Sequence, residues 1–294
     1  KPSNVATVRS KEAKVQALLR KAKGLGGDKQ ELGGPCVATL GQLLHKYAHQ
    51  FTVLKAGWSA ELTRINHYLI GAGLRPLECQ EENGARILQD RQMQIGSTTP
   101  NGWRAYREGR LAKRGMTYGL IHAIAAMKCT EVSTSVLRTL HTTMRSEGLS
   151  ESTVQKEFAV LKAAFNVAIR EWGWSDYQNP TIGIRLGKSK SRFVRLTADE
   201  EQRLVDSLSA CDNPEFWPLV ELALTSTMRR GSLLKLEWSN VDLENRQVNV
   251  WAKGFEVNLP LSKRAVELLR LVPYNCTGRV FTMTANGVKM AWQR

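Results

Sequence analysis

Residues 223–262 read ALTSTMRRGSLLKLEWSNVDLENRQVNVWAKGFEVNLPLS. The first half has the apolar spacing of a helix, and two adjacent arginines, Arg229 and Arg230, stand where a short helix to about Leu236 is expected to begin. The second half alternates apolar and polar residues on both sides of Gly254, which is typical of a β-hairpin. The segment therefore predicts a helical domain that contains a small antiparallel β element.

A second helical pattern, in residues 150–172, is the clearest in the chain. Its apolar residues recur at steps of three and four, which places them on one helix face. Ser150 or Ser152 can cap its first turn, and the sequence NPTIG is expected to end it. The predicted apolar face consists of Val154, Phe158, Leu161, Phe165 and Ile169.

Shorter patterns fill most of the remaining chain. Residues 39–71 predict two helices joined around KAGWS, whereas residues 72–102 are expected to be irregular. Thr197, followed three residues later by Glu200, forms a capping box at the start of another helix. Helical spacing returns in SKRAVELLRLV and in the final GRVFTMTANGVKMAWQR. These patterns predict a mainly α protein with a small antiparallel β element, an α+β fold.

Changes in composition divide the chain into four segments. A Gly-rich stretch and a short basic stretch poor in acids separate the helical regions. The predicted segments are a basic N-terminal segment with a Gly-rich linker at 1–36, a helical domain at 37–187, a basic linker at 188–195 and a second domain at 196–294.

Positive charge is concentrated in one part of the chain. The whole sequence has a net charge of +15. Residues 1–195 hold 30 basic and 15 acidic residues, whereas residues 196–294 hold 12 of each. A field of this sign attracts polyanions, usually nucleic acid, so we expect the first part to supply most of the nucleic-acid affinity. The alternative is a basic surface with no specific partner.

Several other classes of protein are not indicated. The apolar run GMTYGLIHAIAAM is shorter than the ~20 residues that a membrane span needs, and residues 1–30 lack the apolar core of a signal peptide. Five scattered cysteines predict free thiols in a reducing compartment. Without an acidic cluster or His/Cys ligand spacing, we expect neither a metal nor a cofactor. The histidines, which are expected at ordinary helical positions, are His45, His49, His67, His122 and His141.

The segment ALTSTMRRGSLLKLEWSNVD resembles the first catalytic box of the tyrosine recombinase (phage-type integrase) family, approximately A-L-x-T-G-x-R-x-x-E-L-x-x-L-x-W-x-D-[IV]-D. The hairpin carries Lys253 before NLPLS, which is similar to the family's hairpin lysine and its VPLS-like exit. The helix at 150–172 and the stretch TADEEQRLV are also similar to the family, so the resemblance covers roughly residues 39–294. The residues that match the box are Ala223, Leu224, Arg229, Leu233, Leu236, Trp238, Val241 and Asp242.

This resemblance implies a site-specific DNA recombinase or integrase that transfers phosphodiester bonds through a 3′-phosphotyrosyl intermediate. It implies a helical, SAM-like core DNA-binding domain at 37–187 and an incomplete catalytic domain at 196–294. The implied partner is double-stranded DNA at a recombination site, bound by a homotetramer in the cytoplasm, with the nucleoid. The basic residues of the helix and the linker that we expect to contact DNA are Lys156, Lys162, Lys188, Lys190 and Arg192.

The resemblance assigns catalysis to Arg229 and Lys253. A guanidinium offers paired donors to the non-bridging oxygens of a phosphorane-like transition state, which suits Arg229. A hairpin lysine can lie along the minor groove and protonate the leaving 5′ oxygen. Taken alone, each residue is more often part of a solvated surface or a turn, and we keep that interpretation for Arg230.

The chain departs from the family pattern in both halves of the expected site. Thr227 replaces the family's glycine, and Ser232 replaces its acidic residue. No histidine follows Lys253, and the one tyrosine after it, Tyr274, comes too early to be the nucleophile. We therefore expect a chain cut inside the catalytic domain and inactive as it stands. Two alternatives stay open: a non-catalytic DNA-binding remnant or regulator of recombination, and a helical nucleic-acid-binding protein of another family.

Overall fold

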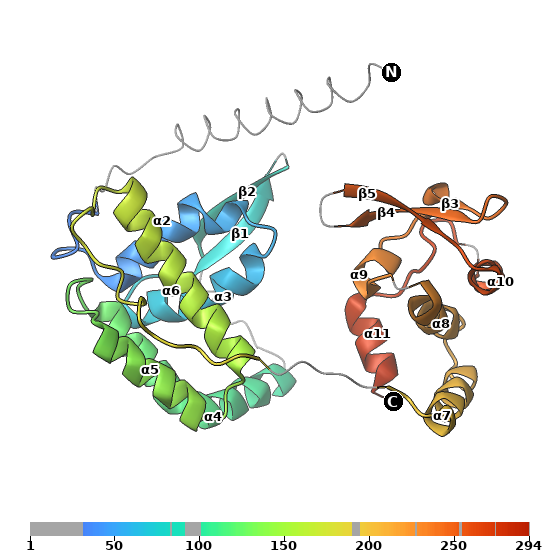
Figure 1. Cartoon of the computed structure of the whole chain (residues 1–294), viewed down its shortest axis with the longest axis horizontal. Helices are drawn as coiled ribbons and strands as arrows, with labels where there is room; N and C mark the ends of the chain where they lie inside the picture. The colour runs from blue at the N-terminus through green and yellow to red at the C-terminus, as the bar shows by residue number, and fades with distance from the viewer. Residues whose placement is uncertain are drawn as a thin grey trace, which may run out of the picture. The chain divides into compact units, whose positions relative to one another are not determined.

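The computed structural model divides the chain into two compact units, residues 1–191 and 192–294, each of which is described by itself (Figure 1). Both units are mainly helical, and each has one small antiparallel sheet, so the α+β fold class is confirmed. The structure describes residues 32–82, 84–91, 101–189, 195–226, 228–252, 255–273 and 275–293. The basic N-terminal segment before residue 32 lies outside this description.

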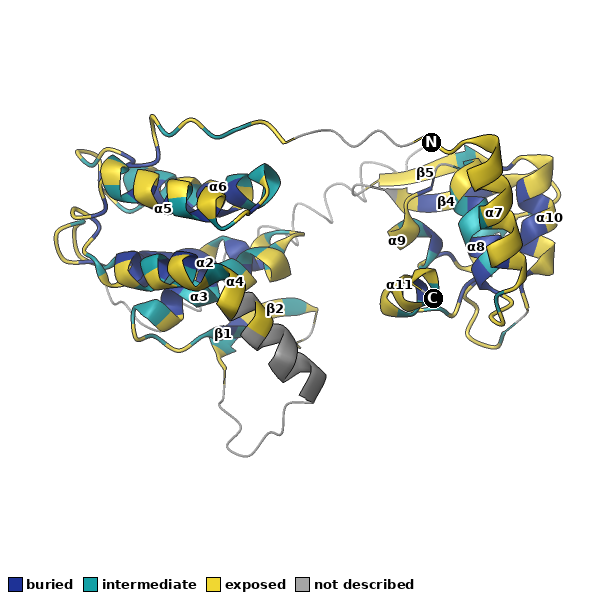
Figure 2. Cartoon of the chain, turned by 90° about the horizontal axis from the view of Figure 1, so that it is seen from below, coloured by how far each residue is buried: buried dark blue, intermediate teal, exposed yellow. Residues whose placement is uncertain are grey.

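Unit 1 is a bundle of helices with a β-hairpin between the second and third long helices. Buried residues lie on the inward sides of its helices (Figure 2). The elements are α2 (Leu40–Gln50), η1 (Thr52–Leu54), α3 (Trp58–Gly71), β1 (Leu77–Glu82), β2 (Ala85–Asp90), α4 (Asn101–Ala126), α5 (Thr134–Ser146) and α6 (Glu151–Glu171).

The hairpin β1–β2 corrects the expectation that residues 72–102 are irregular. The strands pair antiparallel, from Leu77 with Asp90 to Glu82 with Ala85. The sequence conceals them because polar and charged residues lie on both faces, so the period-two alternation of a half-buried strand is missing. Asn66 of α3 holds the start of β1, since its amide donates to the Leu77 carbonyl and accepts from the Leu77 N–H, both at 2.8 Å.

Helix α6 has the apolar face that its sequence predicts. Ser150 is its N-cap, and four of the five predicted apolar residues are fully buried, while Ile169 is partly buried. The helix ends at Glu171, before the NPTIG sequence that was expected to end it. Gly173 has a φ of +79°, a conformation that glycine adopts without strain, and it turns the chain there.

The segment after α6 folds back over the helices of unit 1, where Figure 1 shows it crossing the bundle. It is held by side-chain to backbone hydrogen bonds, which satisfy carbonyls far away in the sequence. These bonds are Trp174 Nε1 to the Gly33 carbonyl (3.1 Å), Tyr177 hydroxyl to the Cys129 carbonyl (2.5 Å), Asn179 Nδ2 to the Lys162 carbonyl (3.1 Å) and Gln155 Nε2 to the Gly187 carbonyl (2.5 Å).

Helix α4 is two helical pieces joined at Arg114, whose φ of −139° and ψ of 24° are not helical. The second piece therefore begins with unpaired backbone N–H groups, as any helix does. The Glu147 carboxylate caps it by accepting from the N–H groups of Met116 (2.9 Å) and Thr117 (3.2 Å). A residue 30 positions away in the sequence thus takes the role of a local cap.

Unit 2 has a three-stranded antiparallel sheet in the order β3-β4-β5, packed with helices around a separate core. The Thr197–Glu200 capping box, the hairpin and the two C-terminal helices are present as predicted. The elements are α7 (Ala198–Ser209), α8 (Phe216–Ser226), α9 (Arg230–Leu233), η2 (Trp238–Asn240), β3 (Val241–Asp242), β4 (Gln247–Ala252), β5 (Phe255–Pro260), α10 (Lys263–Leu271) and α11 (Ala285–Trp292).

Helix α9 is shorter than its sequence suggests. It begins at Arg230, as expected, but ends at Leu233 instead of Leu236. Beyond Leu233 the chain turns, and the Leu236 carbonyl accepts from the Val280 N–H at 2.8 Å. None of the helices in the described part of the chain is long and apolar enough to cross a membrane.

The five cysteines are unpaired, as predicted. Cys129 is buried, and burial raises the pKa of its thiol to about 12. Cys36 in unit 1 and Cys276 in unit 2 are exposed.

A carboxyl group is buried inside unit 1. Glu157 of α6 lies 3.6 Å from the guanidinium of Arg64, and Tyr68 and Arg114 are also close enough to act on it. Burial raises the pKa of Glu157 above its ordinary value, and the three neighbours only partly oppose this effect. The folded state therefore holds the Glu157 proton more tightly than the unfolded state does.

We expect this carboxyl to make folding pH-dependent. A raised native pKa means that its contribution to stability is complete below the unfolded value of about 4.5 and is lost as the pH rises through the native value. Relative to Glu157→Gln, the wild-type chain should lose up to about 1.4 kcal/mol per pH unit in that window. Urea unfolding of both proteins from pH 4 to pH 8 measures the difference. Glu171→Gln, a change at an exposed position, serves as the control. A difference in unfolding free energy between the wild type and Glu157→Gln that does not change with pH would contradict this expectation.

Candidate functional site

The corner between α8 and α9 determines where the predicted catalytic arginine lies. Arg229 is the N-cap of α9 and has an extended backbone, with φ −69° and ψ 142°. Met228 before it and Leu233 after it are buried in the core of unit 2, with exposures of 7% and 0%. The Ser226 hydroxyl stabilises the turn, because it donates to the Leu222 carbonyl and accepts from the Met228 N–H. The backbone is therefore anchored on both sides of Arg229.

The two arginines at this corner point to solvent. Arg229 and Arg230 are both exposed, and neither forms an ion pair with a described carboxylate. In contrast, Arg264 of α10 is bound to Glu221 through two bonds of 2.6 and 3.0 Å and to Glu267 through one of 3.2 Å. The corner arginines thus keep their donors available for an anion from outside the chain.

The two strands that flank the predicted hairpin lysine in the sequence are paired. The ladder of β4 and β5 runs from Gln247 with Pro260 to Ala252 with Phe255. Lys253 itself is outside the described residues, so its role stays a prediction. Val248 and Val250 anchor the hairpin in the core, while Phe255 is 72% exposed near its end.

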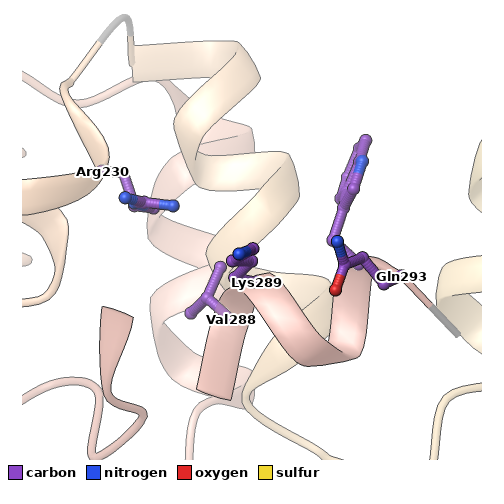
Figure 3. A pocket seen from close by; sticks show the side chains of 5 residues that line it. Arg230, Val288, Lys289 and Gln293 are labelled. Atoms are coloured by element: carbon purple, nitrogen blue, oxygen red, sulfur yellow. The ribbon is translucent and has the colours of Figure 1, made fainter. Parts of the chain in front are cut away.

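A hollow of about 340 Å³ lies between α9 and α11. Figure 3 shows Arg230 on one side of this hollow and Val288 and Lys289 of α11 on the other, with Gln293 directly after that helix. Trp292, which is 59% exposed, completes the lining. Lys289 has no ion-pair partner among the described residues, so two free cations and an indole share this hollow.

A buried carboxylate holds the segment that leads into α11. Glu215, directly before α8, accepts from the N–H groups of Thr282 (2.8 Å) and Met283 (3.1 Å) and from the Thr282 hydroxyl (2.6 Å). Glu215 is only 8% exposed, so these bonds form in a region that water hardly reaches. They fix the start of α11 relative to α8 and therefore the distance across the hollow.

The two lysines of α6 that were expected to contact DNA lie on different faces of the helix. Lys156 and Lys162 are exposed on α6, but six residues along a helix place them about 120° apart around its axis. Lys188 is exposed after Gly187, and Lys190 and Arg192 lie outside the described residues. No group of three or more potential metal ligands occurs within the described ranges.

Residues 194–283 match the family model described as "Phage integrase family". The chain carries a phage integrase family domain. This domain includes both the corner arginines and the hairpin, and relatives named as recombinases and integrases match the chain as well.

Two curated relatives illustrate the similarity of this integrase domain and its surroundings. The shufflon-specific DNA recombinase of Escherichia coli is 36% identical over 148 residues, which is 49% of this chain and 38% of that protein. Tyrosine recombinase XerC of Actinobacillus pleuropneumoniae serotype 7 is 27% identical over 145 residues, 47% of this chain and 46% of that protein. The matched segments thus span less than half the length of either relative.

Solved structures of phage and transposon integrases are also similar. A lambda integrase dimer bound to a COC′ core site has a TM-score of 0.49 and 20% identity, with 67% of this chain and 77% of that chain covered. The Tn1549 transposon integrase in complex with circular intermediate DNA has a TM-score of 0.46 and 19% identity, with 65% and 68% covered.

Sequence reasoning found the arginine corner of the integrase domain but missed the hollow beside it. Lys289 and Trp292 belong to a short amphipathic pattern near the end of the chain, and nothing local links them to Arg230. Glu215 was also missed, because a single acid before a helix is usually a solvated cap.

We expect Glu215→Ala to destabilise the integrase domain. It leaves the donors of Thr282 and Met283 without their buried acceptor, which should cost about 2–4 kcal/mol. Calorimetric unfolding of the whole chain measures the loss, and faster amide exchange at Thr282 and Met283 would locate it. The control is Glu244→Ala, an exposed acid of the same unit. Equal effects of the two substitutions would show that the Glu215 contacts contribute no special stability.

Proposed function

We propose that this chain is part of a site-specific DNA recombinase in which Arg229 and Lys253 act on the phosphate that is attacked. The single observation that supports the proposal most is the α8–α9 corner, where Met228 and Leu233 are buried while Arg229 between them is exposed and forms no ion pair with any carboxylate that the structure describes. A guanidinium that is not neutralised by the protein can stabilise the charge of phosphoryl transfer without a metal, and the anchored backbone positions it. The integrase domain at 194–283, which contains this corner, supports the same activity.

The proposal includes a division of roles between the two units. Unit 1 carries an excess of basic residues, including the exposed Lys156, Lys162 and Lys188, so it is proposed to hold the DNA duplex. Lys190 and Arg192 would continue this contact along the linker at 188–195, between domains at 37–187 and 196–294. The relatives include integrases bound to DNA as dimers, and we propose that this chain also works on DNA as an oligomer, a tetramer, at the nucleoid.

We propose that Tyr274 is not the nucleophile. It is the only tyrosine after Lys253, and it comes before any position that could match the family's second box. The chain alone is therefore proposed to bind DNA without cleaving it. Ser232, which replaces the acidic residue of the first box, favours a second candidate function, a non-catalytic DNA-binding regulator.

The test needs a protein that contains this chain and cleaves DNA, expressed from the longest reading frame. In that protein, Arg229→Ala should lower the cleavage rate roughly a hundred- to a thousand-fold, with nearly unchanged DNA affinity. The reason is the loss of one charged contact to the transition state, worth ~3–4 kcal/mol. Single-turnover cleavage of a labelled duplex gives the rate, and fluorescence anisotropy gives the affinity. Arg230→Ala is the matched variant, and a larger loss of rate for it would reverse the assignment.

A trapping experiment tests the assignment of the nucleophile. The 294-residue chain, mixed with a nicked suicide substrate that retains any phosphotyrosyl bond, should give no covalent complex on a denaturing gel. We propose that no tyrosine of this chain reaches the phosphate at Arg229, so no phosphotyrosyl bond can form. A shifted band that disappears in Tyr274→Phe would identify Tyr274 as the nucleophile and end this part of the proposal.

A further inference from the structure

The hollow between α9 and α11 has the chemistry of an anion site. Arg230 and Lys289 line it together, and neither is neutralised by a described carboxylate. Two cations that line one hollow repel each other, so an anion between them is stabilising. A guanidinium and an ammonium are also the two side chains that proteins use most for phosphate.

The apolar part of the hollow indicates that the anion is attached to something larger than a free ion. Trp292 is 59% exposed, and the buried Val288 of the same helix also lines the hollow. An exposed indole beside two cations can pack against a sugar ring while the cations hold the phosphate. The volume of about 340 Å³ lies at the lower end of the range for small-molecule pockets, which is enough for one nucleotide unit.

The charge of this part of the chain supports the same occupant. Residues 196–294 are neutral as a whole, but residues 196–221 hold seven acids and one cation, whereas residues 222–294 hold eleven cations and five acids. Both walls of the hollow belong to the basic part. A polyanion is therefore attracted to this part although the net charge of residues 196–294 is zero.

We propose that the hollow binds one nucleotide unit of a DNA strand, with Arg230 and Lys289 on its phosphate and Trp292 against its deoxyribose. This inference rests on the proposed function for its ligand class but assigns different residues. Arg230 then has a role of its own: it contributes to DNA affinity, and its neighbour Arg229 contributes to the chemical step.

A small probe tests the hollow without duplex DNA. Thymidine 3′,5′-bisphosphate is titrated into the whole chain, and the indole N–H resonance of Trp292 is followed by NMR after assignment with Trp292→Phe. We expect a saturable shift at millimolar probe that is absent in the double variant Arg230→Gln, Lys289→Gln. No shift, or the same shift in the double variant, overturns the proposal. A shift with polyglutamate but not with the bisphosphate would also overturn it, in favour of an acidic protein partner.

Duplex DNA tests the contribution to affinity. Anisotropy with a 30-base-pair duplex over a salt series should show about 10- to 30-fold weaker binding by the double variant, with a salt slope smaller by about one to two. The matched control is Lys263→Gln, Arg270→Gln, which removes the same charge from exposed positions on α10. Equal losses in the two double variants overturn the proposal. A wild-type chain that does not bind the duplex contradicts the proposed function instead, while the bisphosphate titration still decides on the hollow.

Discussion

The extended backbone at Arg229 is the constraint on which unit 2 depends. Helix α8 must end, and α9 must begin, without withdrawing Met228 or Leu233 from the core. With both neighbours buried, the arginine side chains at the corner have to face water. Burying either guanidinium without a partner would cost several kcal/mol, so the packing of apolar residues also specifies where the charge lies. The packing of the core thus determines that these two arginines are exposed.

The same logic explains which features could be predicted from the sequence. The capping box at Thr197, the hairpin around Gly254 and the apolar face of α6 are local, since each depends on residues a few positions apart. The resemblance also located Arg229, because its motif is a continuous stretch. Lys253, the partner expected from the same resemblance, is beyond what the structure describes.

The features that were missed depend on contacts between distant segments. The hairpin β1–β2 is held by Asn66, which a strand pattern cannot include. Where a longer α9 was expected, Leu236 instead bonds to Val280, 44 positions later in the chain. The hollow requires Lys289 to meet Arg230, and Glu215 fixes that approach from a third segment. Tertiary packing decided each case, and none of these pairings leaves a periodic signal.

The unpaired thiols have a practical consequence for chemistry done on the protein. The thiolate is the reactive form of cysteine, and Cys129 with its raised pKa and buried position hardly populates it near neutral pH. Maleimide dyes should therefore modify Cys36 and Cys276 well before Cys129. Because these two exposed thiols belong to different units, a donor and an acceptor fluorophore attached to them would report by energy transfer whether the units move when a ligand is added. With the partly exposed Cys79 and Cys211 replaced, the chain thus carries its own pair of labelling sites for such an experiment.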